Sequence, residues 1–387
     1  MSADRARASV DVGAIERNCL RLRSELRGEV QLCAVVKADG YGHGAAQSAR
    51  AAMAGGAGWL AVATAQEARD LREAGLTAPR VLVMGALSPA ELSEALAADA
   101  DIVVWREQDV QAVAAAGGGR VHAKLDSGMG RLGTRDVEQA SRVLAAAQAA
   151  TGVEPVGAMT HFATSDELHD DGFFAGQLDT FAGWARAMKA AHPQLLVHAA
   201  NSAAVLRDRA AHFDMVRCGI AVYGMDPFGE DPFARALRPA LELTSYVAEV
   251  KPCRAGESAG YGRRFVADRD TYLGVLPIGY GDGWRRALSN NAEVLVAGRR
   301  HPLVGTVSMD NITIELGAED SARRLRGELA TLIGVQGEER ITAEDVARRL
   351  GTINYEVTCA LTPRVPRVYH RGLARVGQPT GEEGRGA

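Results

Sequence analysis

The sequence predicts an α/β protein, with an N-terminal (β/α)8 barrel in residues 1–240 and a mostly β domain in residues 241–387. About eight short apolar segments alternate with Ala-rich helical segments, over roughly the length that a TIM-type barrel needs. Beyond about residue 240 the helical segments become sparse, and Gly, Pro and β-branched residues become more frequent. A doubly wound sheet is the alternative fold, which the lack of a GxGxxG motif after the first strand weakens.

The barrel elements follow one another along the chain. An amphipathic helix comes first, with five apolar residues on one face: Val12, Ile15, Cys19, Leu22 and Leu26. The strands are expected at residues 30–36, 59–64, 80–84, 101–105, 120–125, 155–162, 195–200 and 215–224. Segments such as 65–75 and 88–99 have the composition of the helices that connect them.

The second domain carries clear strand and helix signals of its own. In "NITIEL", Ile312, Ile314 and Leu316 alternate with polar residues, which predicts a half-buried strand. A helix is expected after Thr342, since Thr342 and Asp345 have the spacing of a capping box. The tail, residues 377–387, is expected to fray.

Composition excludes several classes of protein. Hydrophobic residues make up 47% and charged residues 24%, which is ordinary for a soluble globular protein. The net charge of −4 offers no electrostatic footprint for nucleic acid or an anionic membrane. No apolar run reaches the length of a membrane span, and the charged N-terminus does not resemble a secretory signal. The five cysteines form no CxxC pair, so we expect reduced, buried thiols in a cytoplasmic protein rather than disulfides or a metal site.

Polar residues are expected on the inner face of several barrel strands. Barrel strands point alternate residues inward, and the C-terminal rim of such barrels holds the active site. The alternation assigns four inward sets: Cys33, Val35 and Lys37; His122, Lys124 and Asp126; Gly157, Met159 and His161; Met215, Arg217 and Gly219. A confined group of cations is costly unless an anion lies among them.

An anionic, phosphate-bearing cofactor that bonds to a lysine would fit this cluster. "RCGIAVYG" places glycine-flanked N–H groups at a strand end, an arrangement that cradles phosphate in many barrels. Ser202 is expected at a helix N-terminus, and Tyr41 could add a hydroxyl group. Each signal is weak alone, because a serine at such a position is usually only a helix cap.

A series of motifs resembles the alanine racemase family. In family order these are "AVVKADGYGHG", "KLDSGMGRLG", "THFATSDE", "HAANSAA", "VRCGIAVYG", "AGYGRRF", "GYGDG", "GTVSMDN" and "NYEV". The resemblance implies a pyridoxal 5′-phosphate enzyme with a barrel and a C-terminal β domain. It also implies a head-to-tail homodimer that interconverts L- and D-alanine for the bacterial cell wall.

The resemblance assigns four catalytic roles. Lys37 matches the lysine that carries the cofactor and acts as the base toward D-alanine. Tyr261 matches the base toward L-alanine, and His161 the histidine that hydrogen-bonds to this tyrosine. Arg217 matches the residue that faces the pyridine nitrogen. Taken singly, these could be a lysine leaving a strand for solvent, a β-sheet tyrosine, a core histidine and an arginine in a structural ion pair.

The resemblance also assigns binding residues. The cofactor would be held by Tyr41, Asn201, Ser202, Arg217, Gly219, Ile220 and Tyr355, any of which could otherwise be a capping or packing residue. Arg131 and the backbone N–H of Met309 would bind the substrate carboxylate, and Tyr280 would narrow the entrance. Ser308 precedes Met309 where relatives often have cysteine.

Lys124 has a separate role in many family members, where the matching lysine is carbamylated and orients the arginine. The alternatives for Lys124 are solvent exposure or an ion pair with Asp126. Other functions that the residues leave open are a serine-preferring or broad-spectrum racemase, a fold-type III decarboxylase and a non-catalytic cofactor carrier. Decarboxylases generally place a carboxylate at the pyridine nitrogen, which Arg217 contradicts, and carriers lack the β domain.

Overall fold

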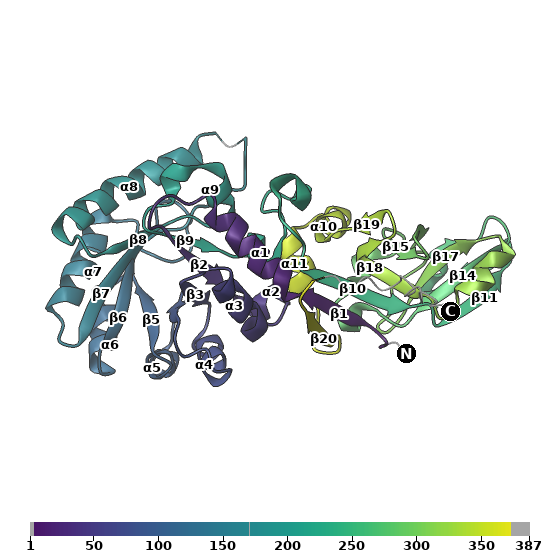
Figure 1. The fold of residues 1–387 in the computed structure, drawn as a ribbon, viewed down its shortest axis with the longest axis horizontal. Helices are drawn as coiled ribbons and strands as arrows, with labels where there is room; N and C mark the ends of the chain where they lie inside the picture. The colour runs from purple at the N-terminus through teal and green to yellow at the C-terminus, as the bar shows by residue number, and fades with distance from the viewer. Residues whose placement is uncertain (1–3, 170, 373–387) are drawn as a thin grey trace, which may run out of the picture.

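The computed structural model describes residues 4–169 and 171–372. It is elongated, with a helix-wrapped barrel at one end and a β domain at the other (Figure 1). Within the described residues, no helix combines the length and the apolar character that crossing a membrane requires.

Eight parallel strands close the barrel, which confirms the predicted fold class. They are β2 Gln31–Val35, β3 Trp59–Val62, β4 Arg80–Val83, β5 Ala100–Val104, β6 Gly119–Lys124, β7 Val153–Met159, β8 Leu196–His198 and β9 Met215–Cys218. All eight predicted strands run one to six residues beyond the observed C-terminal ends. The first ends at Val35, and the last ends at Cys218 because the chain turns at Gly219 into a short 3-10 helix, Ile220–Tyr223.

Helices surround the barrel (Figure 1). They are α1 Val12–Arg23, α3 Ala45–Ala54, α4 Ala65–Glu73, α5 Pro89–Ala97, α6 Glu107–Ala115, α7 Val137–Ala149, α8 Phe173–Ala191 and the short α9 Ser202–Arg207. Local sequence explains several starts: Thr64 with Glu67, and Ser88 with Glu91, form capping boxes. The apolar face predicted for the first helix is buried at Ile15, Cys19 and Leu22.

The β domain contains a seven-stranded sheet in the order β16-β15-β18-β10-β1-β20, with β19 paired to β18. Its strands are β1 Arg7–Asp11, β10 Leu241–Tyr246, β15 Glu293–Val296, β16 Arg299–Pro302, β18 Leu329–Gln336, β19 Glu339–Ile341 and β20 Arg367–His370. Strand β1 was not predicted. It pairs with β10 and β20, so residues 7–11 lie in the second domain before α1 returns to the barrel.

Two smaller sheets complete this domain. One contains β11 Glu249–Cys253, β14 Thr271–Leu276 and β17 Ile312–Gly317, and the other β12 Ser258–Ala259 and β13 Phe265–Val266. Strand β17 buries Ile312, Ile314 and Leu316 as predicted. Two helices follow, α10 Ala343–Leu350 and α11 Asn354–Cys359, and α10 begins at the predicted capping box. The predicted fraying tail lies outside the described residues.

Candidate active site

A cavity of about 440 Å³ lies at the C-terminal ends of the barrel strands. It collects most of the residues that the sequence singled out: Lys37, Tyr41, Lys124, Arg131, His161, Asn201, Ser202, Arg217, Gly219, Ile220 and Tyr355. Most come from strand ends and from the loops that follow them, and Tyr355 comes from α11, which packs against the start of the barrel (Figure 1). Cavities of this size bind small ligands and cofactors.

Lys37 begins a left-handed turn instead of ending the strand, which corrects the prediction. The short element α2, Lys37–Tyr41, has φ values of 51°, 51°, 61° and 54° at Ala38, Asp39, Gly40 and Tyr41. Glu67 holds this turn, because its Oε1 accepts a hydrogen bond of 2.6 Å from the N–H of Ala38. Burial and the nearby Arg131 lower the pKa of Lys37, which favours the neutral, nucleophilic amine.

Several polar side chains that can hydrogen-bond to a ligand also line the cavity. Ser202 is the first residue of α9, and Asn201 is its cap, accepting from the N–H of Ala204 at 3.0 Å. Ser202 Oγ accepts from the N–H of Gly219 at 3.0 Å, so α9 and the end of β9 are tied together. The tyrosine rings of Tyr41 and Tyr355 lie 5.9 Å apart, and burial raises the pKa of both. Their hydroxyl groups therefore remain protonated donors.

Arg217 is buried in the floor of the cavity, 3% exposed. It donates to the carbonyls of Thr160 and Ala199 at 2.8 and 3.0 Å, to His198 Nδ1 at 2.9 Å and to His161 Nδ1 at 3.2 Å. None of these partners is a carboxylate, so Arg217 forms no ion pair within the part of the chain that the structure describes. Burial lowers the pKa of Arg217 to about 10, which still leaves it charged at neutral pH. Burial and Arg217 together lower the pKa of His161 well below its usual value, so His161 is neutral.

Lys124 is buried in the cavity wall, 4% exposed. Burial, followed by Arg217 and Arg131, lowers its pKa to about 8. Asp126 lies two residues beyond the end of β6, and its carboxylate accepts from the N–H groups of Gly128 and Gly130 and pairs with Arg135. Solvent exposure of Lys124 is therefore wrong, and among the described residues Asp126 forms its ion pair with Arg135 rather than with Lys124.

Three predicted residues do not line the cavity. Tyr261, Tyr280 and Met309 lie on the β domain and are 72%, 41% and 51% exposed. Two of them, Tyr280 and Met309, lie near each other, because the N–H of Tyr280 bonds at 3.0 Å to the carbonyl of Ser308, the residue before Met309. Within a single chain, the β domain thus presents these side chains to the outside.

The structure also brings in residues that the sequence analysis did not single out. Met84, Gly85, Leu132 and Cys359 line the cavity, and Cys359 is exposed where a buried thiol was expected. The other four cysteines are buried, and all five are free. His198 contacts Arg217 directly. The alternation rule applied to the strand at 195–200 could have identified it.

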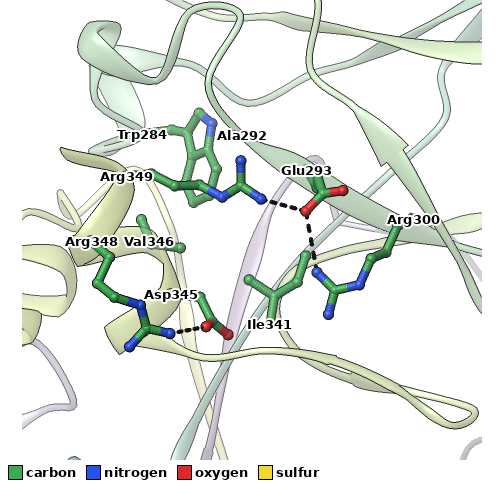
Figure 2. Close-up of a pocket in the computed structure, with 9 residues that line it drawn as sticks. All are labelled: Trp284, Ala292, Glu293, Arg300, Ile341, Asp345, Val346, Arg348 and Arg349. Carbon is green, nitrogen blue, oxygen red and sulfur yellow. Dashed lines mark hydrogen bonds and ion pairs between the residues drawn. The ribbon is translucent and has the colours of Figure 1, made fainter. Parts of the chain in front are cut away.

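A second cavity, of about 300 Å³, lies in the β domain between β15, β16 and α10 (Figure 2). Its charges are mutually paired: Glu293 bonds to Arg300 at 3.3 Å and also to Arg349, while Arg348 pairs with Asp345. None of the predicted site residues lines it. The barrel cavity is therefore the candidate active site.

Comparisons with known proteins show what the chain is similar to. A family model described as the alanine racemase N-terminal domain matches residues 10–227, and the one for the C-terminal domain matches residues 240–369. The chain is 40% identical to alanine racemase 1 of Bacillus subtilis over 372 residues, covering 94% of this chain and 92% of that protein. It is 41% identical to the alanine racemase of Geobacillus stearothermophilus over 370 residues, covering 94% and 93%. Among solved structures, the alanine racemase from Streptomyces coelicolor superposes with a TM-score of 0.88 at 37% identity, covering 94% and 97%.

Proposed function

The chain belongs to the alanine racemase family, and from that premise we propose that it interconverts L- and D-alanine with pyridoxal 5′-phosphate in the barrel cavity. The observation that carries the proposal is the meeting of Lys37, the buried Arg217 and the donors around Ser202 in one cavity. The resemblance seen in the motifs is confirmed at family level. Nothing in the comparisons favours a decarboxylase, a broad-spectrum racemase or a carrier.

The residues of the cavity fit the cofactor. The hydroxyls of Tyr41, Tyr355 and Ser202 and the N–H of Ile220 form a donor set suited to a phosphate group, and Gly219, whose N–H bonds to Ser202 Oγ, lines the same place. Gly219 belongs to this fit, because a Cβ there would lie 2.3 Å from the hydroxyl oxygen of Tyr41. Lys37 supplies the amine for covalent attachment. When bound, the cofactor withdraws electrons from the Cα of the substrate and so acidifies its hydrogen.

A Gly219→Ala variant should bind the cofactor roughly tenfold more weakly or worse, which is the order of one lost hydrogen bond to a charged group. The added methyl group would push Tyr41 off its position. Titrating cofactor-free protein with pyridoxal phosphate by absorbance measures the change. Gly176→Ala is the matched control, since a methyl group added at this position of α8 would meet no other atom within 4 Å. Unchanged affinity in Gly219→Ala would remove Tyr41 from the phosphate site.

Arg217 directs the chemistry toward racemisation. Its guanidinium only donates hydrogen bonds and holds its proton, so it does not protonate the pyridine nitrogen as a carboxylic acid would. A weaker electron withdrawal follows, which suits proton exchange at Cα and disfavours transamination. The same reasoning argues against the decarboxylase alternative.

Two bases on opposite faces of the substrate are the simplest device for racemisation. We assign the face that leads to D-alanine to Lys37 and the opposite face to Tyr261. A free phenol titrates near pH ~10, so the phenolate needs a neighbour that stabilises it. Because His161 Nδ1 accepts from Arg217, its proton is on Nε2, where it can donate to Tyr261. Arg131, exposed at the edge of the cavity, would bind the substrate carboxylate.

The exposed position of Tyr261, Tyr280 and Met309 supports a shared site. We infer that these residues enter the barrel cavity of a second copy of the chain, in a head-to-tail homodimer with two sites. Met309 would donate its N–H to the substrate carboxylate, and Tyr280 would narrow the entrance. Each chain would then complete the active site of the other.

The direct test is racemisation of L-alanine by the purified protein with added pyridoxal phosphate, followed by circular dichroism. We expect conversion to a one-to-one mixture of enantiomers, and lower kcat/KM for L-serine and larger amino acids at matched concentration. A protein that binds the cofactor but leaves L-alanine optically unchanged would refute the proposed activity. Preference for serine would support the broader racemase instead.

Lys124 is a candidate for carbamylation. Its neutral amine would attack the carbon of CO₂, forming a C–N bond and releasing the amine proton to solvent, so that a buried cation becomes an anion beside Arg131. The lowered pKa, about 8, provides neutral amine at mildly alkaline pH. Such a carbamate would orient Arg131 toward the substrate carboxylate, whereas a free ammonium would repel the arginine.

Holoenzyme equilibrated with ¹³C-labelled bicarbonate should show one protein-bound carbamate signal by ¹³C NMR, and the signal should grow as pH rises toward 8. Lys124→Met should abolish it, and Lys189→Met, on the outer surface of the barrel, should leave it unchanged. A wild-type spectrum without the signal at saturating bicarbonate would refute the carbamate.

The physiological setting follows from the same premise. We propose a cytoplasmic enzyme that supplies D-alanine for peptidoglycan, in agreement with five free cysteines. We expect its partners to be a second copy of the chain and small-molecule substrates. Neither nucleic acid nor a membrane is an expected partner of a chain with a net charge of −4.

A further inference from the structure

A continuous chain of hydrogen bonds runs through the barrel interior from Arg217 to Asp101, near the opposite end of the barrel. Arg217 Nη1 bonds to His198 Nδ1, His198 Nε2 to His122 Nδ1, and His122 Nε2 to Asp101 Oδ2, each at 2.9 Å. The four side chains come from strands β9, β8, β6 and β5, and none is more than 3% exposed.

Arg217 and Asp101, at the two ends of this series of hydrogen bonds, determine which ring nitrogen of each histidine carries a proton. Arg217 can only donate, so His198 Nδ1 must accept and His198 Nε2 must carry the proton. Asp101 as a carboxylate can only accept, so His122 Nε2 carries a proton and His122 Nδ1 accepts from His198. Only one arrangement satisfies every contact: both imidazoles are neutral and protonated on Nε2.

Asp101 is held as a carboxylate by cations at the barrel end. Arg120 Nε donates to Oδ1 at 2.8 Å, and Arg80 donates to both oxygens, with its Nε 3.2 Å from Oδ1. Burial alone would raise the pKa of Asp101, but the hydrogen bond from His122 and those from Arg80 and Arg120 lower it to about 2. The acceptor end of the chain therefore keeps its charge throughout the neutral range.

Packing leaves His122 little freedom to turn. Trp59 contacts its ring edge to face, with centroids 5.8 Å apart, and Arg80 covers the Trp59 ring at 4.5 Å. On the other side, a Cβ at residue 157 would lie 2.1 Å from His122 Nδ1, so this position accepts only glycine. The imidazole is thus fixed in the orientation that the hydrogen bonds require.

We propose that Asp101 is a positioning residue for racemisation, which acts through His122 and His198 to hold the guanidinium of Arg217 in place at the cofactor site. This rests on the proposed function. Without the carboxylate, His198 can carry its proton on Nδ1, where it would face an N–H of Arg217. The guanidinium would then lose one of its acceptors and gain a repulsive contact.

The first experiment measures tautomers in the wild-type holoenzyme. With ¹⁵N-labelled histidine, we expect His122 and His198 to be neutral with the proton on Nε2 at neutral pH. Spectra of His122→Leu and His198→Asn assign the two signals among the nine histidines. A proton on Nδ1 of either ring would overturn the proposal, and this measurement does not depend on whether alanine is the substrate.

The second experiment changes the acceptor. In Asp101→Asn, Arg80 and Arg120 should donate to the amide oxygen, which turns the amide N–H₂ toward His122. The direction of each hydrogen bond between residue 101 and His198 is then reversed. We expect the proton of His198 to move to Nδ1. We also expect kcat for alanine to fall roughly 10- to 100-fold, the usual effect of losing a group that orients a functional residue. KM should change little, because Arg131 is untouched.

Asp99→Asn is the matched control. Asp99 also pairs with Arg120, at 2.7 Å, but it is solvent-exposed and takes no part in the series of hydrogen bonds from Asp101 to Arg217. Its φ of 51° is one that asparagine tolerates. This variant should keep both the tautomers and kcat, and Asp101→Glu should recover most of kcat by restoring a carboxylate.

A folded Asp101→Asn protein with reversed hydrogen-bond directions and wild-type kcat would overturn the proposal. If Asp101→Asn does not fold, His122→Leu interrupts the chain while leaving the arginine pairs of Asp101 intact, and unchanged kcat there would overturn it equally.

Discussion

Replacing Lys37 with alanine should abolish racemisation and the covalent attachment of the cofactor together. The activity should fall by at least about 10³-fold, because one substitution removes both the nucleophile that holds the cofactor and one of the two bases. Lys37 is suited to both tasks, since burial lowers its pKa at the edge of the barrel cavity. Borohydride reduction of the holoenzyme, followed by peptide mass mapping, should locate the cofactor on Lys37 in the wild type and nowhere in the variant.

The residue that carries the cofactor can be assigned unambiguously, because the sequence has only four lysines, Lys37, Lys124, Lys189 and Lys251. Lys189→Ala and Lys251→Ala are controls that should retain the adduct and full activity, since both positions lie outside the cavity. Lys124 is the informative competitor, because its pKa is also lowered by burial. A reduced adduct that maps to Lys124 would refute the assignment, even if Lys37→Ala were inactive.

Strand alternation explains how much of the site could be predicted. It identified Lys124 and Arg217 because both lie within regular strands, where every second residue faces the barrel interior. It also placed Lys37 at the cavity, but it did not indicate that the chain there enters a left-handed turn that includes Ala38, Asp39 and Tyr41. Non-glycine residues rarely adopt this conformation, so no sequence pattern indicates it.

Other parts of the structure depend on contacts between distant segments. The Asp101 to Arg217 chain needs four strands brought together by barrel closure, and a single histidine or aspartate in a strand gives no sign of it. The pairing of β1 with β10 and β20 is likewise invisible in five residues at the start of the chain. Fold class was easier to predict, because it follows from a repeated pattern of strands and helices.

A Tyr261→Phe variant should lose racemisation but keep proton exchange on one face of the substrate. It should still bind the cofactor on Lys37 and still exchange the α-hydrogen of D-alanine with deuterated solvent, because Lys37 addresses that face. Exchange from L-alanine should fall at least about 10²-fold, the usual contribution of a general base. Proton NMR of each enantiomer in D₂O measures both rates. Equal loss of exchange from both enantiomers would show that the two faces are not divided between Lys37 and Tyr261.

The same two variants test where Tyr261 acts. In a head-to-tail dimer, each site combines a barrel from one chain with a β domain from the other, so a mixed dimer of Lys37→Ala and Tyr261→Phe contains one site with both lesions and one with neither. Chains unfolded and refolded together should therefore regain activity that neither parent has. Random pairing makes about half of the dimers mixed, each with one intact site of two, so recovery should approach about a quarter of wild type. The exposure of Tyr261, at 72%, is the observation that motivates the test. If mass measurements confirm mixed dimers and activity stays at the level of the parents, Tyr261 works within its own chain and the shared site is wrong.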